Sequence, residues 1–161
     1  MLAVMIPNEQ SSPHDDLPRY DESQLPPLTT DRDIERRVSD QIGRAHSRQL
    51  WLLFLDQFDI QLPVLIPIEG LPPEPTDDQC ARVVDRVREL MGEIGATAVV
   101  TVLERYGPAT LTVQDAGWAR SLRQGFADRG VMLRAQLLSH RTGVRWIGDE
   151  DTPTEVRPAA G

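Results

Sequence analysis

Hydrophobic residues recur along this chain with two different spacings, and the change of spacing predicts where helices and strands lie. Apolar residues three or four positions apart indicate amphipathic helices, whereas short continuous apolar runs indicate buried strands. Helices are expected over residues 31–45, 77–94 and 113–129, and strands over 50–55, 60–68, 98–103, 131–138 and 144–147. The order α-β-β-α-β-α-β-β predicts an α/β (α+β) domain, with a single mixed sheet of about five strands flanked by helices.

Each expected helix follows a threonine that can form a capping box with a residue three positions later. These pairs are Thr30 with Asp33, Thr76 with Gln79, and Thr112 with Asp115. The first helix carries a narrow apolar stripe, formed by Ile34, Val38, Ile42 and Ala45. Such a stripe must pack on something, either the sheet or a partner molecule.

Two prolines, Pro63 and Pro67, lie inside the expected strand 60–68. A proline has no N–H to donate to a neighbouring strand, so this strand is expected at an edge of the sheet or at a bulge. The run over residues 50–55 is apolar throughout, which is typical of a central strand buried on both faces. We expect the two strands to form a hairpin.

The second helix carries its apolar residues on one face, and Cys80 belongs to that face. We therefore interpret Cys80 as a small buried hydrophobic residue and not as a nucleophile. It is the single cysteine of the 161 residues, which excludes a disulfide bond or a thiolate zinc cluster within one chain.

The net charge of −8 belongs to the two ends of the chain. Residues 1–33 hold seven acidic residues and two arginines, and residues 148–161 hold four acidic residues and one arginine, so the part between them is neutral overall. The composition predicts a disordered acidic N-terminal segment over residues 1–30, a single α/β domain over 31–148, and a flexible acidic tail over 149–161.

The same composition argues against several classes of protein. A nucleic-acid-binding protein would usually show a basic face, which the charge pattern does not predict. Apolar runs are too short to cross a bilayer, so no membrane partner is expected. The first residues lack the basic region of a signal peptide, and the single cysteine fits a reducing compartment. A cytoplasmic protein is therefore expected.

The loop that joins the strand 98–103 to the third helix is the place where a catalytic centre lies in several α/β architectures. Its candidate site residues are Glu104, Tyr106, Thr112 and Asp115. Each has a simpler interpretation. Thr112 and Asp115 form a helix cap, Glu104 and Arg105 form a solvated or locally paired couple, and Tyr106 either packs on the third helix or serves as a binding contact.

The pattern of this loop and the segments around it resembles the RadC-like branch of the JAB/MPN (JAMM) metalloprotease fold. The family motif is His, any residue, His, seven residues of any kind, Ser, any two, Asp. When the motif is aligned on Asp115, its serine falls on Thr112, and a glycine of the family, within the seven-residue stretch, falls on Gly107. The helix that ends at Gly130 and the strand VMLRAQLLSH also resemble the family, and the likeness covers residues 47–148. It implies a cytidine-deaminase/JAB-like arrangement in a cytoplasmic bacterial protein.

The chain departs from this motif at both histidines, whose positions fall on Val102 and Glu104. Zinc in such a site is held by two imidazoles, a carboxylate and water. Valine has no ligand atom, and two carboxylates alone favour a hard cation over zinc. We therefore expect no zinc hydrolysis, no metal ligands, no catalytic residues and no cofactor.

Two functions remain as hypotheses. The first is a non-catalytic JAB/RadC-like domain that acts as a binding or assembly module in the bacterial cytoplasm, through a protein partner or self-association. The alternative is a carboxylate-based, divalent-metal-dependent hydrolase that uses the same loop, with Glu69, Glu104 and Asp115 around the ion. A third interpretation is an unrelated α/β sandwich. The sequence favours a protein that is not an enzyme, because the metal-binding motif of the resembled family is degenerate.

Overall fold

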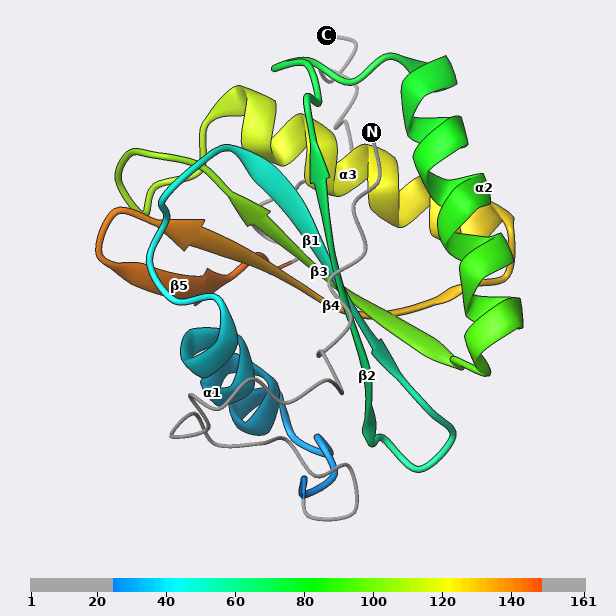
Figure 1. Cartoon of the computed structure of the whole chain (residues 1–161). Helices are drawn as coiled ribbons and strands as arrows, with labels where there is room; N and C mark the ends of the chain where they lie inside the picture. Colours follow the sequence, from blue (N-terminus) through cyan, green and yellow to red (C-terminus); the bar gives the residue numbers. More distant parts are fainter. Residues whose placement is uncertain (1–24, 149–161) are drawn as a thin grey trace, which may run out of the picture.

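The computed structural model of the protein describes residues 25–148 and shows one five-stranded sheet with three helices (Figure 1). The elements are α1 (Asp31–Gln41), β1 (Gln49–Leu55), β2 (Gln61–Glu69), α2 (Asp77–Ile94), β3 (Ala98–Glu104), α3 (Val113–Asp128), β4 (Met132–His140) and β5 (Gly143–Trp146). This is the element order that the hydrophobic spacing predicts, and it confirms the α+β class with a single mixed sheet.

The strands lie in the order β2-β1-β3-β4-β5. Neighbouring strands are antiparallel except for β3 and β4, which are parallel and are joined by the crossover helix α3. All seven residues of the central strand β3 are buried. β1 and β2 form the expected hairpin, and β2 lies at the edge of the sheet as its two prolines predict.

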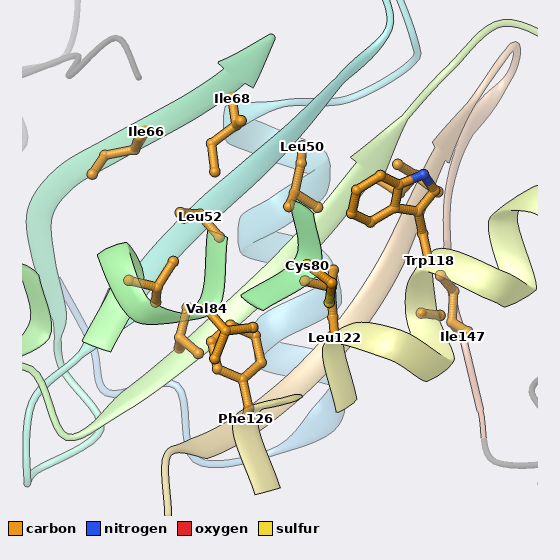
Figure 2. Close-up of a cluster of buried hydrophobic side chains, with 14 of the residues drawn as sticks. Leu50, Leu52, Ile66, Ile68, Cys80, Val84, Trp118, Leu122, Phe126 and Ile147 are labelled. Carbon is orange, nitrogen blue, oxygen red and sulfur yellow. The ribbon is translucent and has the colours of Figure 1, made fainter. Parts of the chain in front are cut away.

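The helices divide between the two faces of the sheet, with α2 and α3 on one face and α1 on the other (Figure 1). The core under α2 and α3 is closed by three large side chains of α3, namely Trp118, Leu122 and Phe126 (Figure 2). Cys80 of α2 lies in the same core and is 5% exposed, which confirms its interpretation as a buried hydrophobic residue.

The apolar stripe of α1 packs on the sheet. Ile34 and Val38 are fully buried against residues of β1, β3 and β4. The sheet is therefore the partner that the stripe requires. Arg32, Arg36 and Asp40 of α1 are exposed, whereas Arg37 is buried and donates to Oε1 of Gln61 at 2.8 Å.

Helix α1 is shorter than the spacing predicts, since it ends at Gln41 and not near Ala45. Gly43 adopts a φ of 67°, and this left-handed conformation ends the helix. Ala45 is buried as expected of a core position, but it lies in a loop, where its N–H donates to the carbonyl of His140 at 2.8 Å. The predicted end of the helix was wrong because Ala45 keeps the apolar spacing of the helix although it is buried in the loop that follows it.

The folded part of the chain extends upstream of α1. Leu28 is 2% exposed, belongs to the core under α1, and donates its N–H to the carbonyl of Asp59 at 2.8 Å. The expectations for residues 1–24 and for the tail over 149–161 lie outside the described residues. No helix between residues 25 and 148 is long and apolar enough to cross a membrane.

Candidate functional site

The end of β3 carries two charged side chains that are both buried. Glu104 is 3% exposed and Arg105 is 5% exposed. Because successive side chains of a strand point to opposite faces of a sheet, Glu104 lies on the face of α1 and Arg105 on the face of α3. The expectation of a solvated or locally paired couple was wrong: each residue has its own partners, in a different layer of the molecule.

Glu104 is held by four hydrogen bonds, two to each carboxylate oxygen. Oε2 accepts from the backbone N–H groups of His46 and Ser47 at 2.6 and 3.0 Å. Oε1 accepts from Gln49 Nε2 at 2.6 Å and from Trp51 Nε1 at 2.9 Å. The carboxylate therefore ties the segment before β1, and β1 itself, to the end of β3.

These bonds also set the charge of the carboxylate. Burial alone raises the pKa of Glu104, but the hydrogen bonds from the segment 46–51 outweigh it, so the pKa lies below its ordinary value. Glu104 is thus an anion whose acceptor sites are already taken by N–H donors. Such a carboxylate has little capacity left to hold a metal ion or to move a proton.

Arg105 organises the loop on the other face. Its Nε and Nη2 donate to Oδ2 of Asp115 at 3.0 and 2.7 Å. Its guanidinium also donates to the carbonyls of Pro108 at 2.6 Å and Thr110 at 2.9 Å. One buried cation therefore joins the strand end, the loop over residues 106–112 and the first turn of α3.

Asp115 has the role of a helix cap as well as an ion-pair partner. Thr112 and Asp115 form a complete capping box, with Thr112 N donating to Asp115 Oδ2 at 2.9 Å and Asp115 N donating to Thr112 Oγ1 at 3.1 Å. Asp115 is 2% exposed. Its Oδ2 accepts hydrogen bonds from both Arg105 and the N–H of Thr112, and the bond from Thr112 is the one that the capping interpretation predicts.

Tyr106 does not pack on α3. Its side chain is 68% exposed, and its hydroxyl donates to the backbone carbonyl of His46 across the strand end. Directly after this loop, Val113 at the start of α3 is 91% exposed. Between these two residues the sequence YGPATLTV contains no charged side chain. The loop therefore presents an uncharged, partly apolar surface that is fixed from beneath by Arg105.

The three candidate carboxylates do not form one site. Glu69 is exposed on β2, and Gln49 of β1 pairs with both Glu69 and Glu104 in the sheet register. Two strand spacings place the Glu69 and Glu104 backbones about 10 Å apart. Asp115 lies on the opposite face of the sheet. Among residues 25–148, no group of three His, Cys, Asp or Glu side chains is arranged to hold a metal ion.

The end of β4 completes this edge of the molecule. Ser139 Oγ donates to the carbonyl of Gly43 at 2.6 Å, and Arg141 N donates to the carbonyl of Gly107 at 2.9 Å. These two hydrogen bonds bring the segments 43–48, 105–107 and 139–142 together.

His140 lies in the last of these segments and is 7% exposed. Burial lowers its pKa first, and the positive charges of Arg105 and Arg145 lower it further.

A groove of about 440 Å³ lies elsewhere, between α2 and α3. Its lining residues include Asp77, Cys80 and Arg129. Arg129 is engaged by Asp85 at 2.6 Å, and burial raises the pKa of the Cys80 thiol, which makes it a weak nucleophile at neutral pH. This groove holds none of the candidate residues at the end of β3.

The sequence indicated Glu104, Thr112 and Asp115 as candidates and predicted the capping pair of Thr112 with Asp115, but it gave no signal for the donors to Glu104 or for the ion pair of Asp115 with Arg105. The donors to Glu104 lie more than fifty residues earlier in the chain, in the segment 46–51. The burial of Arg105 could be inferred only from its place directly after the buried strand β3, where the alternation of side chains puts it on the face of α3.

Comparison of the chain with protein-family models gave no match, and comparison with curated protein sequences gave none. The interpretation of the site therefore depends on its geometry.

Proposed function

We propose that this chain is a non-catalytic binding or assembly module of the JAB/RadC-like type, acting in the bacterial cytoplasm. Its contact surface is the loop over residues 106–112 together with Val113, the first residue of α3. The observation that carries this proposal is that the charged groups at the strand end are engaged in structural contacts. Glu104 accepts four hydrogen bonds, and Asp115 is engaged by Arg105 and by the cap of α3.

The loop has two properties that suit recognition of a partner. It is rigid, because a buried guanidinium binds two of its carbonyls and the helix that follows it. It is also exposed and uncharged, with Tyr106 and Val113 largely open to solvent. A surface held in one conformation loses less entropy on binding than a flexible one, and exposed aromatic residues are frequent anchors in interfaces.

The edge strand β2 is a weaker candidate for the contact surface. Pro63 and Pro67 each remove an N–H that an added strand would need. The geometry likewise offers no support for the carboxylate-based hydrolase, since Glu104 and Asp115 lie on opposite faces of the sheet. The loop therefore remains the surface that the structure favours.

Site-specific photo-crosslinking in the native host tests this proposal. A photoreactive amino acid is placed at Val113 of the full chain, and a matched control carries it at Arg88, an exposed position on α2. The proposal predicts a defined crosslinked species from position 113 that is missing from position 88. Equal, diffuse crosslinking from both positions would contradict it.

A further inference from the structure

Three arginines gather around the same strand end and are exposed. Arg44 and Arg48 lie in the segment before β1, and Arg141 follows β4. We call these three residues the basic rim. Their segments are brought together by hydrogen bonds from Ala45 N to the carbonyl of His140 and from Arg141 N to the carbonyl of Gly107. The charge pattern of the sequence does not reveal this rim, because Arg141 lies more than ninety residues after Arg44 and Arg48 in the chain.

Among the described residues, the basic rim lacks neutralising partners. The segments 42–48, 105–114 and 139–147 contain no acidic residue at all. Glu104 lies beneath the rim but is buried, and Glu69 borders it on the side of β2. Within residues 25–148, no ion pair involves an arginine of the rim, whereas the exposed Arg86 and the half-buried Arg129 and Arg134 each pair with a carboxylate.

The basic rim is continuous with the uncharged loop. Tyr106 bridges them, since its hydroxyl donates to the carbonyl of His46, between Arg44 and Arg48. Beyond Tyr106 the exposed residues are small or apolar, namely Pro108, Ala109, Thr110, Thr112 and Val113. One edge of the molecule therefore offers cations on one side and an apolar strip on the other.

We infer that this edge docks an acidic peptide segment of a partner protein, in which carboxylates flank an aliphatic or aromatic anchor residue. Arginine suits this occupant because its planar guanidinium binds a carboxylate through two parallel hydrogen bonds. The apolar strip beside the rim suits the anchor residue. A nucleic acid fits less well, because its phosphates have no use for the aliphatic loop and a binder of nucleic acid usually carries a far larger basic surface. The inference rests on the proposed binding function and adds the chemistry of the partner.

Peptide display on the full chain, followed by fluorescence anisotropy with the enriched peptide, tests the inference. The rim variant combines Arg48→Glu with Arg141→Glu. The matched control combines Arg82→Glu with Arg88→Glu, two exposed arginines of α2 that make the same change in net charge. Unchanged thermal unfolding midpoints show that both variants are folded.

The inference predicts enriched peptides that combine several carboxylates with an apolar anchor. Their Kd should rise about tenfold or more in the rim variant and by less than about twofold in the control, and binding should weaken with added salt. Neutral or basic enriched peptides, equal binding to the rim variant, or a selection without any binder would overturn the inference. Tighter, rim-dependent binding of single-stranded oligothymidylate would also overturn it. If position 113 crosslinks as predicted but any of these results is found, the proposed binding function is retained and only the acidic nature of the partner is rejected.

Discussion

Glu104 and Arg105 are consecutive in the sequence, yet their side chains hold opposite layers of the molecule together. Glu104 binds the segment that enters β1 on the face of α1, whereas Arg105 binds Asp115 at the start of α3 on the other face. The end of β3 is therefore a structural junction. The exposed loop that follows it is held by the same junction.

The first prediction concerns the acceptors of Glu104. In Glu104→Gln, one carboxylate oxygen becomes an NH₂ group, so at least one of the N–H groups that face it loses its acceptor. A buried unsatisfied donor costs about 1–3 kcal/mol, and we expect the free energy of unfolding to fall by about 2–4 kcal/mol. Chemical denaturation measures the change. Glu93→Gln, at an exposed position of α2, is the control and should change the stability by less than about 0.5 kcal/mol.

The second prediction concerns pH. The pKa of Glu104 is lower in the folded chain than its ordinary value of 4.5, so the unfolded chain binds more protons between the two values. The stabilisation by Glu104 is therefore present above pH 4.5 and is lost as the pH falls below it. The difference in unfolding free energy between wild type and Glu104→Gln should shrink in that acidic range. A difference that is constant or grows toward low pH would show that the carboxylate is not held as an anion.

The third prediction compares a buried ion pair with an exposed one. Asp115→Ala leaves Arg105 buried without its carboxylate and removes half of the capping box, so we expect a loss of about 3–5 kcal/mol. The exposed pair Arg86–Glu89, with both side chains more than 60% exposed, supplies the control. Glu89→Ala should cost less than about 1 kcal/mol. Similar losses of unfolding free energy in Asp115→Ala and Glu89→Ala would show that Asp115 does not hold the end of β3 to α3.

The fourth prediction uses the backbone of the loop. Gly107 has a φ of 122°, and an added Cβ would lie 3.1 Å from Nη1 of Arg105. Gly107→Ala should therefore cost about 1–3 kcal/mol through backbone strain and displacement of the guanidinium. Gly92→Ala, in helix α2 with nothing within 4 Å of the new methyl group, should instead be neutral or stabilise by up to about 1 kcal/mol. Thermal unfolding of the two variants, side by side, makes the comparison.

Local patterns were sufficient to predict most of the fold. The Thr112 capping box, the prolines of β2 and the apolar stripe of α2 act through neighbours a few residues away, so their consequences can be read from spacing. The end of α1 was missed because Ala45 is buried through a loop that packs against β4, and burial alone does not distinguish a loop from a helical turn.

The candidate site was harder to predict for a related reason. Buried charged residues are uncommon, so Glu104 and Arg105 were expected in solvent. Their burial depends on donors and acceptors that come from distant segments, such as Trp51 for Glu104. The basic rim has the same origin, because Arg48 and Arg141 become neighbours only when β1, β3 and β4 are assembled.

The central claim is that the carboxylates at the end of β3 serve structure and not metal chemistry. Elemental analysis by mass spectrometry, on the full chain purified without chelators and then supplied with zinc or manganese, tests it most directly. The account predicts far less than one bound metal ion per chain, equally for wild type and for Glu104→Gln. One tightly bound zinc or manganese ion per wild-type chain, lost in that variant, would contradict it.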